Sequence, residues 1–397
     1  MKKICYYCGT FFPKVPYLDY NIYYYLKENN INISFIIKKN DIRLTGIKNE
    51  NTLLEFNHHK YINIENLIKI ENLNELTNIT KKFDLFLCTN LSIDRLEINH
   101  EEFFKLIKTK KCILDVCGYD IIKKGYFNTN IDYFLVKGNI FKEWLEKLNI
   151  PSNHIYVTGS PLFDYCFPHK LKKNYKKLNK ISFCEKYDLD INKKTLLITT
   201  TNLKSVRNSM NHQNYLEFEK FYNKNESKYN YILLSYPLDY LFYETKAKYR
   251  RSENKQECPD YETMQNNFKN LKIIKVNDNY NALKHSNIIF HLSAGALSIE
   301  TILLFNNIST TMHFKDKDYY KKKIGYSKFV KFPDDIANIH LNNIDELNSA
   351  NTSANANANA NANANMEIVK NKLNKFIYIT NAHKNMLNSL NQILNSL

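Results

Sequence analysis

The sequence predicts an α/β protein built on two doubly wound parallel sheets. Three observations favour this class. Short buried apolar runs alternate with helix-like segments, the alternation stops at a Lys-rich stretch and then restarts, and 397 residues exceed the usual size of one compact domain. The apolar fraction of 44%, with 29 Tyr and 24 Phe, is sufficient for packed cores. We place residues 1–168 in the first domain and residues 169–397 in the second.

The first domain opens on a buried strand at Lys3–Cys8. After two prolines, Tyr17–Asn29 has the spacing of a helix, and so does Ile140–Leu148, where apolar residues recur three and four positions apart. Further apolar runs predict strands at Ile33–Ile37, Phe83–Cys88, Cys112–Cys117, Asp132–Val136 and His154–Val157. This alternation is typical of a doubly wound parallel sheet.

The second domain repeats the pattern after a Lys-rich segment, His169–Lys180, where we place the domain boundary. Strands are predicted at Thr195–Thr200, Tyr231–Ser235, Ile273–Val276, Asn287–Phe290 and Ile308–Phe314. Helices are predicted at Tyr215–Tyr222, Asn279–His285 and Ser298–Phe305. The last two strands and the helix between them make one βαβ unit of a parallel sheet.

Two segments complete the second domain. Residues 349–365 are a low-complexity Ala–Asn repeat with no apolar face, so we expect a disordered loop there. Residues 366–397 predict an amphipathic helix with a break near Thr380. We expect this helix to pack back across both domains.

The charge balance favours an anionic partner. Lys and Arg number 56 against 40 Asp and Glu, an excess of 16 that suits a nucleotide, a lipid phosphate, a membrane surface or a nucleic acid. A compositional bias toward Asn, Lys, Ile and Tyr would produce the same excess, and both explanations stay open. The basic residues are scattered and match no recognised nucleic-acid motif, so specific nucleic-acid binding is not predicted.

Cellular context follows from the apolar runs and the cysteines. No run approaches 18 apolar residues, which excludes a spanning helix, and the first apolar run lacks a signal-peptide cleavage site. Cys5 and Cys8 lie within a strand rather than at a helix N-terminus, so neither redox nor metal chemistry is predicted. We expect a cytoplasmic protein, and peripheral contact with the inner membrane face stays open.

The turn after Asn287–Phe290 is the most informative stretch of the chain. Small residues, among them Ser293 and Gly295, join a buried strand to a helix that begins at Ser298. Such a turn lets a phosphate approach backbone N–H groups at the positive end of a helix. An ordinary tight βα turn would use the same residues, and both interpretations stay open.

Polar residues near other strand ends extend this candidate site. His291 ends the same strand, where it could act in catalysis by bonding a phosphate or sugar, or be an ordinary core histidine. Thr200 and Lys204 follow another strand and are further candidate phosphate ligands, with a solvated loop as the alternative. Parallel strands bring such residues to one edge of a sheet.

Three segments resemble the GT-B superfamily. Asp132–Leu145 resembles the last helical unit of its N-terminal domain, Ile155–Asp164 its "VTGxPxFD" hinge, and Ser293–Glu300 its donor-site "SGxxSxE" turn and helix. The three stand in the superfamily's order and spacing between residues 130 and 315. The resemblance implies two Rossmann-like domains facing a cleft, an N-terminal acceptor domain and a C-terminal nucleotide-donor domain.

The superfamily includes nucleotide-sugar glycosyltransferases, CDP-glycerol and CDP-ribitol phosphotransferases, and UDP-sugar 2-epimerases. The phosphotransferases usually carry a His-Gly-Thr turn where this chain has Cys117-Gly118-Tyr119. The epimerases typically carry Gly-Gly and paired Glu where this chain has Ala-Gly and one Glu. We therefore expect a transferase that uses a nucleotide-activated sugar or glycerol-type phosphate to build a surface glycan, glycolipid or wall polymer. A UDP-sugar 2-epimerase and a non-catalytic binding protein of the same fold are the alternatives.

The resemblance also implies roles for residues. The donor diphosphate would bind the turn from Ser293 to Ser298, and Glu300 would bind the ribose hydroxyls, with neither a metal nor a resident cofactor. A first-turn carboxylate favoured by the helix dipole is the alternative for Glu300. The acceptor would be an anionic or lipid-linked glycan.

The first domain would supply the rest of the cleft through small-residue strand ends. These are Gly9, Thr10, Gly118 and Gly138. Asp120 follows one such turn and is the candidate base that deprotonates the acceptor hydroxyl. A carboxylate capping a helix would look the same in the sequence.

Overall fold

The computed structural model describes residues 2–8, 15–38, 66–90, 98–116, 130–161, 177–199, 209–234, 261–275, 278–291, 309–312, 339–341 and 381–397. The chain divides into two compact units. The first comprises Met1–Tyr165, Lys322–Lys331 and Leu373–Leu397, and the second comprises Cys166–Lys321 and Phe332–Lys372. The change of unit after Tyr165 lies close to the boundary that we placed after residue 168.

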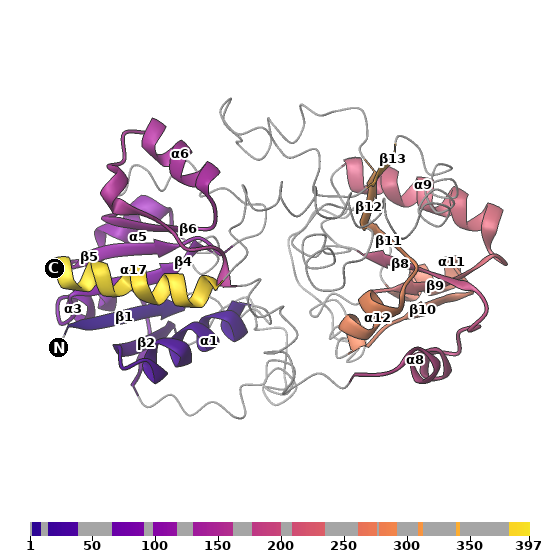
Figure 1. Ribbon diagram of the computed structural model, residues 1–397, viewed down its shortest axis with the longest axis horizontal. Helices are drawn as coiled ribbons and strands as arrows, with labels where there is room; N and C mark the ends of the chain where they lie inside the picture. Colours follow the sequence, from indigo (N-terminus) through magenta and orange to yellow (C-terminus); the bar gives the residue numbers. More distant parts are fainter. Residues whose placement is uncertain are drawn as a thin grey trace. The chain divides into compact units, whose positions relative to one another are not determined.

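The first unit contains a parallel sheet of seven strands in the order β3-β2-β1-β4-β5-β6-β7 (Figure 1). The strands are β1 Lys3–Cys8, β2 Asn32–Lys38, β3 Leu67–Ile70, β4 Leu85–Thr89, β5 Lys110–Leu114, β6 Tyr133–Val136 and β7 Ile155–Val157. From β1 the chain runs outward to β3 and then crosses back to β4 on the other side of β1, which is the doubly wound arrangement. Every strand predicted in this domain is present, and β3 is an addition.

Helices precede or follow these strands. They are α1 Val15–Glu28, η3 Leu73–Glu75, α3 Leu76–Thr80, α5 His100–Lys105, α6 Asn139–Lys147, η5 Ser152–His154 and α17 Ala382–Ser396. Asparagine side chains cap two of them, η3 and α5. The Asn99 side chain caps α5 by accepting a 2.8 Å hydrogen bond from the Glu102 N–H. The helices at 17–29 and 140–148 were predicted, whereas the short helices α3 and α5 were not.

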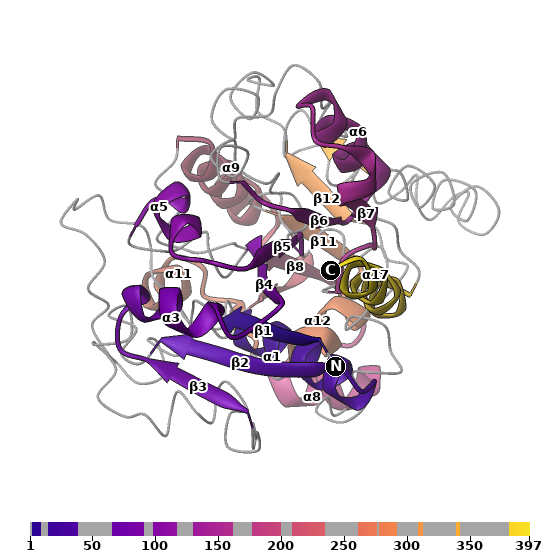
Figure 2. The same cartoon turned by 90° about the vertical axis from the view of Figure 1, so that its left-hand side faces the viewer.

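Side chains of β1 alternate between two covered faces of the sheet. Tyr6 belongs to the core formed with α1 and α17. Tyr7 points the other way, with its ring centroid 6.1 Å from that of Phe86 and 5.2 Å from that of Phe103 in α5. Figure 2 shows α1 and α17 on one side of the sheet and α3 and α5 on the other. Burial on both faces explains why these strands read as continuous apolar runs.

The C-terminal helix α17 belongs to the first unit, which resumes at Leu373, whereas we assigned all of residues 366–397 to the second domain. Its buried face joins the α1 and β1 core through Met386, Leu390, Ile393 and Leu394. Because these apolar side chains complete the first core, the chain returns from the second unit to the first. Asn381 precedes α17 in the left-handed region (φ 52°), beside the break predicted near Thr380.

The second unit repeats the plan with a six-stranded parallel sheet in the order β10-β9-β8-β11-β12-β13. The strands are β8 Lys194–Thr199, β9 Tyr229–Leu233, β10 Leu271–Ile273, β11 Ile288–His291, β12 Ser309–Met312 and β13 Ile339–Leu341. The helices are α8 Lys180–Tyr187, α9 Ser209–Asn225, α11 Tyr261–Asn267 and α12 Asn279–His285. β11 and β12 pair in parallel, as the predicted βαβ unit requires. The helix predicted between them lies outside the described residues.

The second sheet is also covered on both faces. Ile289 packs with Ala282 of α12 and Phe183 of α8. The next residue, Phe290, lies on the opposite face, where its ring centroid is 6.3 Å from that of Phe218 in α9. This alternation along β11 follows from the two-residue period of a strand.

The two cysteines of the CxxC pattern are buried in β1. The Cys5 thiol donates to the Leu85 carbonyl oxygen, and burial raises the pKa of that thiol. A thiol with a raised pKa is a poor nucleophile, so Cys5 contributes packing rather than reactivity. Within the described ranges, no helix has both the length and the apolarity needed to cross a membrane. The Ala–Asn repeat at 349–365 lies outside those ranges.

Candidate functional site

The carboxyl ends of four neighbouring strands of the first sheet lie at the same level. Thr89 of β4 is in register with Leu114 of β5, Leu114 with Leu135 of β6, and Val136 with Val157 of β7. A polar residue follows each strand end directly: Asn90, Asp115, Lys137 and Thr158. In doubly wound sheets this edge is where ligands bind.

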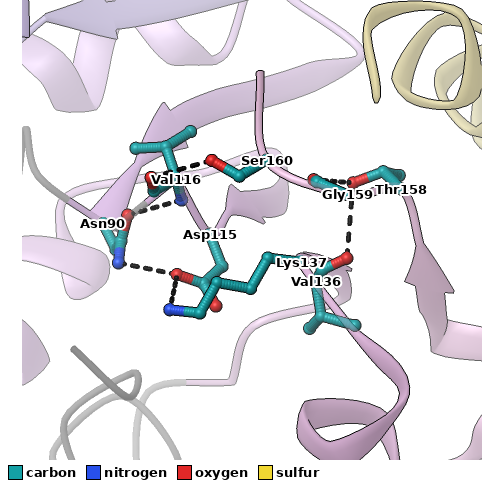
Figure 3. A network of polar contacts seen from close by, with 8 residues as sticks. All are labelled: Asn90, Asp115, Val116, Val136, Lys137, Thr158, Gly159 and Ser160. Carbon is teal, nitrogen blue, oxygen red and sulfur yellow. Dashed lines mark hydrogen bonds and ion pairs between the residues drawn. The ribbon is translucent and has the colours of Figure 1, made fainter. Parts of the chain in front are cut away.

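A buried ion pair lies at the centre of this edge (Figure 3). The Lys137 ammonium is 3.3 Å from Oδ1 of Asp115, and both side chains are fully buried. The Asn90 amide donates to the same carboxylate oxygen at 2.9 Å, and Lys137 Nζ lies 4.3 Å from the centroid of the Phe141 ring. These contacts offset part of the several kcal/mol that desolvating each charge costs.

The residue that follows Asp115 is held on both sides by side chains. The Val116 N–H donates to Asn90 Oδ1 at 3.0 Å, and the Val116 carbonyl oxygen accepts from Ser160 Oγ at 2.9 Å. Asn90 therefore connects the Asp115 carboxylate to the backbone at the exit of β5. Figure 3 shows Asn90 and Ser160 reaching Val116 from different strand ends. We name Asn90, Asp115, Lys137 and Ser160, with the Val116 peptide, the strand-exit network.

The segment after β7 has a conformation that explains one residue of the hinge motif. Gly159 has φ of 81°, a left-handed conformation that favours glycine. The Thr158 N–H continues the sheet by donating to the Val136 carbonyl oxygen, and the Thr158 hydroxyl donates to the Gly159 carbonyl oxygen. The Thr158 carbonyl oxygen accepts at 3.3 Å from the Asn385 amide of α17. The C-terminal helix thus contacts the start of the predicted hinge.

Two of the site residues predicted from the sequence are described. Gly138 is buried beside Lys137 and precedes the first turn of α6 with an extended backbone (φ −165°). His291 is the last residue of β11, in register with Thr199 of β8 and Thr311 of β12, which places it at the carboxyl edge of the second sheet. The remaining predicted residues lie outside the described ranges: Gly9, Thr10, Gly118, Asp120, Thr200, Lys204, Ser293, Gly295, Ser298 and Glu300.

Several of these residues follow a described strand end directly or closely in the sequence. β1 ends one residue before Gly9, and β8 ends one residue before Thr200. Gly118 comes two residues after Val116 of the strand-exit network. Within the described ranges, no group of three or more His, Cys, Asp or Glu side chains is arranged to hold a metal ion.

Sequence reasoning missed most of the strand-exit network. Asp115 was placed inside the predicted strand Cys112–Cys117, although β5 ends at Leu114. The missed signal is a charged residue embedded in an apolar run, because a buried carboxylate needs a partner. Lys137, which ends another apolar run, is that partner. Nothing local in the sequence distinguishes Asn90.

The fold and this edge define an α/β protein with two doubly wound parallel sheets. No protein-family model matches the chain, and no curated protein matches it. The UDP-GlcNAc 2-epimerase of Neisseria meningitidis, solved with UDP-GlcNAc, is similar at 15% identity, with a TM-score of 0.55 over 99% of this chain and 100% of that chain. The wall teichoic acid polymerase TagF is similar at 12% identity, with a TM-score of 0.52 over 100% of this chain and 88% of that chain.

A third solved structure supports the same fold. The UDP-GlcNAc 2-epimerase of Methanocaldococcus jannaschii is 17% identical, with a TM-score of 0.53 over 88% of this chain and 92% of that chain. At these identities the likeness shows the fold. The chain has the GT-B fold, as the three sequence segments predicted.

Proposed function

We propose that this chain is an enzyme that binds a nucleotide-activated substrate at the carboxyl edges of its two sheets. The strand-exit network is the observation that carries the proposal. Two opposite charges and an amide are fully buried at the edge where this fold class binds ligands, at a cost in stability that apolar residues would avoid. Two of the similar solved structures are UDP-GlcNAc 2-epimerases by name, which supports a nucleotide-activated substrate here.

The favoured reaction is transfer of a sugar or a glycerol-type phosphate to an anionic or lipid-linked glycan acceptor. Asp120 takes the proton of the acceptor hydroxyl, whose oxygen then bonds to the sugar carbon or the phosphorus of the donor. The bond to the leaving group breaks at the same centre, which releases a nucleoside diphosphate or CMP respectively. The turn at 293–298 holds the donor phosphates through N–H groups, and Glu300 holds the ribose. We place this reaction in the cytoplasm, at or near the membrane face.

A UDP-sugar 2-epimerase is the second candidate, because two of the similar solved structures carry that name. The two candidates differ in their need for an acceptor. An epimerase changes UDP-GlcNAc alone, by inverting carbon 2 of the sugar, whereas a transferase consumes its donor only when an acceptor is present. Proton NMR of UDP-GlcNAc with the purified chain distinguishes them.

Thermal unfolding with a panel of nucleoside diphosphates tests the proposed substrate class. We expect UDP or CDP to raise the Tm, since a ligand at 100 times its Kd stabilises a folded protein by about 2.7 kcal/mol. Gly295→Trp should abolish the shift, because a bulky side chain would block phosphate from the turn. Leu216→Trp, at a 39% exposed position of α9, is the matched control and should keep it. A panel in which no nucleotide shifts the Tm would contradict the proposal.

A further inference from the structure

The exit of β5 is fixed by side chains where a sheet usually relies on backbone pairing. Asp115 continues the ladder, since its N–H donates to the Leu135 carbonyl oxygen at 2.8 Å. At Val116 both backbone groups form hydrogen bonds with side chains. The N–H donates to Asn90 Oδ1, and the carbonyl oxygen accepts from Ser160 Oγ. Asn90 follows β4 by one residue and Ser160 follows β7 by three, and these strands lie on opposite sides of β5 in the sheet order. The direction of the chain at Val116 therefore depends on two side chains.

The ion pair in turn fixes the orientation of the Asn90 amide. The amide nitrogen donates to the Asp115 carboxylate, so its oxygen must face the Val116 N–H. Lys137 contacts the same carboxylate oxygen at 3.3 Å. Because Asn90 and Ser160 are each only 1% exposed, water does not compete for these bonds. The network is thus a chain of contacts from Lys137 to the peptide that leads into residues 117–120.

We propose that Asn90 and Ser160 are positioning residues, which hold the Val116 backbone where the chain leaves β5, four residues before Asp120, without touching the substrate. This inference rests on the proposed function, in which Asp120 is the base of the transfer. A displacement of about 1 Å of a reacting group can cost on the order of 10²-fold in rate. The network accordingly contributes to turnover, while donor binding depends on the second unit.

Matched variants of Ser160 test the proposal with a donor and acceptor that the wild type turns over. Ser160→Ala removes the hydroxyl that holds the Val116 carbonyl oxygen, and we expect kcat to fall by roughly 10- to 100-fold with the donor KM within about twofold. Ser160→Thr keeps a hydroxyl and should restore most of the rate. Asn90→Ala should act like Ser160→Ala. If the Asn90→Ala protein does not fold, the comparison of Ser160→Ala with Ser160→Thr still tests the proposal.

A control at the opposite edge of the same sheet separates positioning from stability. Thr80 is fully buried and its hydroxyl donates to the Leu76 carbonyl oxygen and accepts from the Lys108 N–H, ahead of β4 and β5. Thr80→Val should lower the Tm as much as Ser160→Ala does and leave kcat unchanged.

The possible outcomes separate a failure of the positioning role from a failure of the proposed function. A wild type that turns over its donor, with Ser160→Ala and Asn90→Ala at wild-type kcat, overturns the positioning role and leaves the proposed function intact. Equal losses of kcat in Ser160→Ala and Thr80→Val also overturn it, because they show a general effect of stability. If the wild type neither binds nor turns over any nucleotide-activated donor, the proposed function is wrong and the inference falls with it.

Discussion

Lys137 and Asp115 carry opposite charges in the interior of the first unit, where each charge is compensated by the other. Lys137→Met keeps most of the side-chain volume and removes the ammonium, which leaves a buried carboxylate beside Asn90. We expect this change to cost about 3–5 kcal/mol of the free energy of unfolding. Trp144, the single tryptophan of the chain, lies on α6 in the same unit, so its fluorescence during urea unfolding measures the loss.

Two further variants complete this experiment. Adding Asp115→Leu to Lys137→Met should recover part of the loss, because it removes the uncompensated charge. Lys110→Met removes a solvent-exposed partner of Asp132 at 2.8 Å, and we expect a cost of no more than about 1 kcal/mol. A Lys137→Met protein as stable as the Lys110→Met protein would show that the buried pair is energetically unimportant.

We expect His285 to make the second unit sensitive to acid. Burial lowers the pKa of its imidazole, and a 2.8 Å contact from Nε2 to the Leu178 carbonyl oxygen opposes this shift only in part. In the unfolded chain the imidazole has its ordinary pKa of about 6.5. As the pH falls, the unfolded state therefore takes up the proton before the folded state does. The contribution of the neutral imidazole to the free energy of unfolding is fully present above that pH and is lost as the pH falls below it.

A substitution at His285 tests this pH dependence. His285→Gln keeps an N–H donor for Leu178 and removes the titration, so its urea midpoint should change less between pH 7.5 and 5.5 than that of the wild type. Far-UV circular dichroism follows the unfolding. Equal changes in both proteins would place the acid sensitivity at other groups.

The residues that sequence reasoning identified stand at the ends of apolar runs, whereas those it missed form bonds to residues far away in the chain. Gly138 and His291 were expected near strand ends because the end of an apolar run is visible in the sequence. The structure has Gly138 two residues after β6 and His291 as the last residue of β11, and their roles in a site stay predictions. Asn90 and Ser160 form hydrogen bonds with the Val116 backbone, which is 26 and 44 positions away from them in the chain. No periodicity or local spacing encodes such a pairing.

At the scale of elements, the apolar runs were predicted well, whereas β3, β13, α3, α5, α8 and α11 were not predicted. α12 was predicted at Asn279–His285, the bounds that the structure gives. β3 is a four-residue edge strand in which a lysine interrupts the apolar pattern, so nothing in the sequence marks it.

The helix α17 provides a prediction at this scale. Leu390 is fully buried in the first core, whereas Asn391 beside it is exposed. We expect Leu390→Ala to cost about 2–5 kcal/mol and Asn391→Ala to stay within about 0.5 kcal/mol. Urea unfolding of the first unit, followed by Trp144 fluorescence, measures both. Similar stability of the two variants would show that α17 does not complete this core.

At the scale of the whole molecule, the two sheets follow one plan. Each begins near its middle, extends to one side and then crosses back to the other. The sequence predicted this plan because both sheets are parallel and covered on two faces, which makes their strands continuous apolar runs. The unit to which the C-terminal helix belongs was not predictable, because an amphipathic face shows that a partner exists without identifying it.

Hydrogen exchange with and without saturating UDP or CDP tests most directly whether the carboxyl edges of these sheets bind the nucleotide. We expect added protection at the segments that follow strand ends, 115–120, 199–204 and 291–300, and unchanged exchange at the amino edges, 80–84 and 192–195. Protection confined to the amino edges, or a bound nucleotide that protects neither edge, would contradict it.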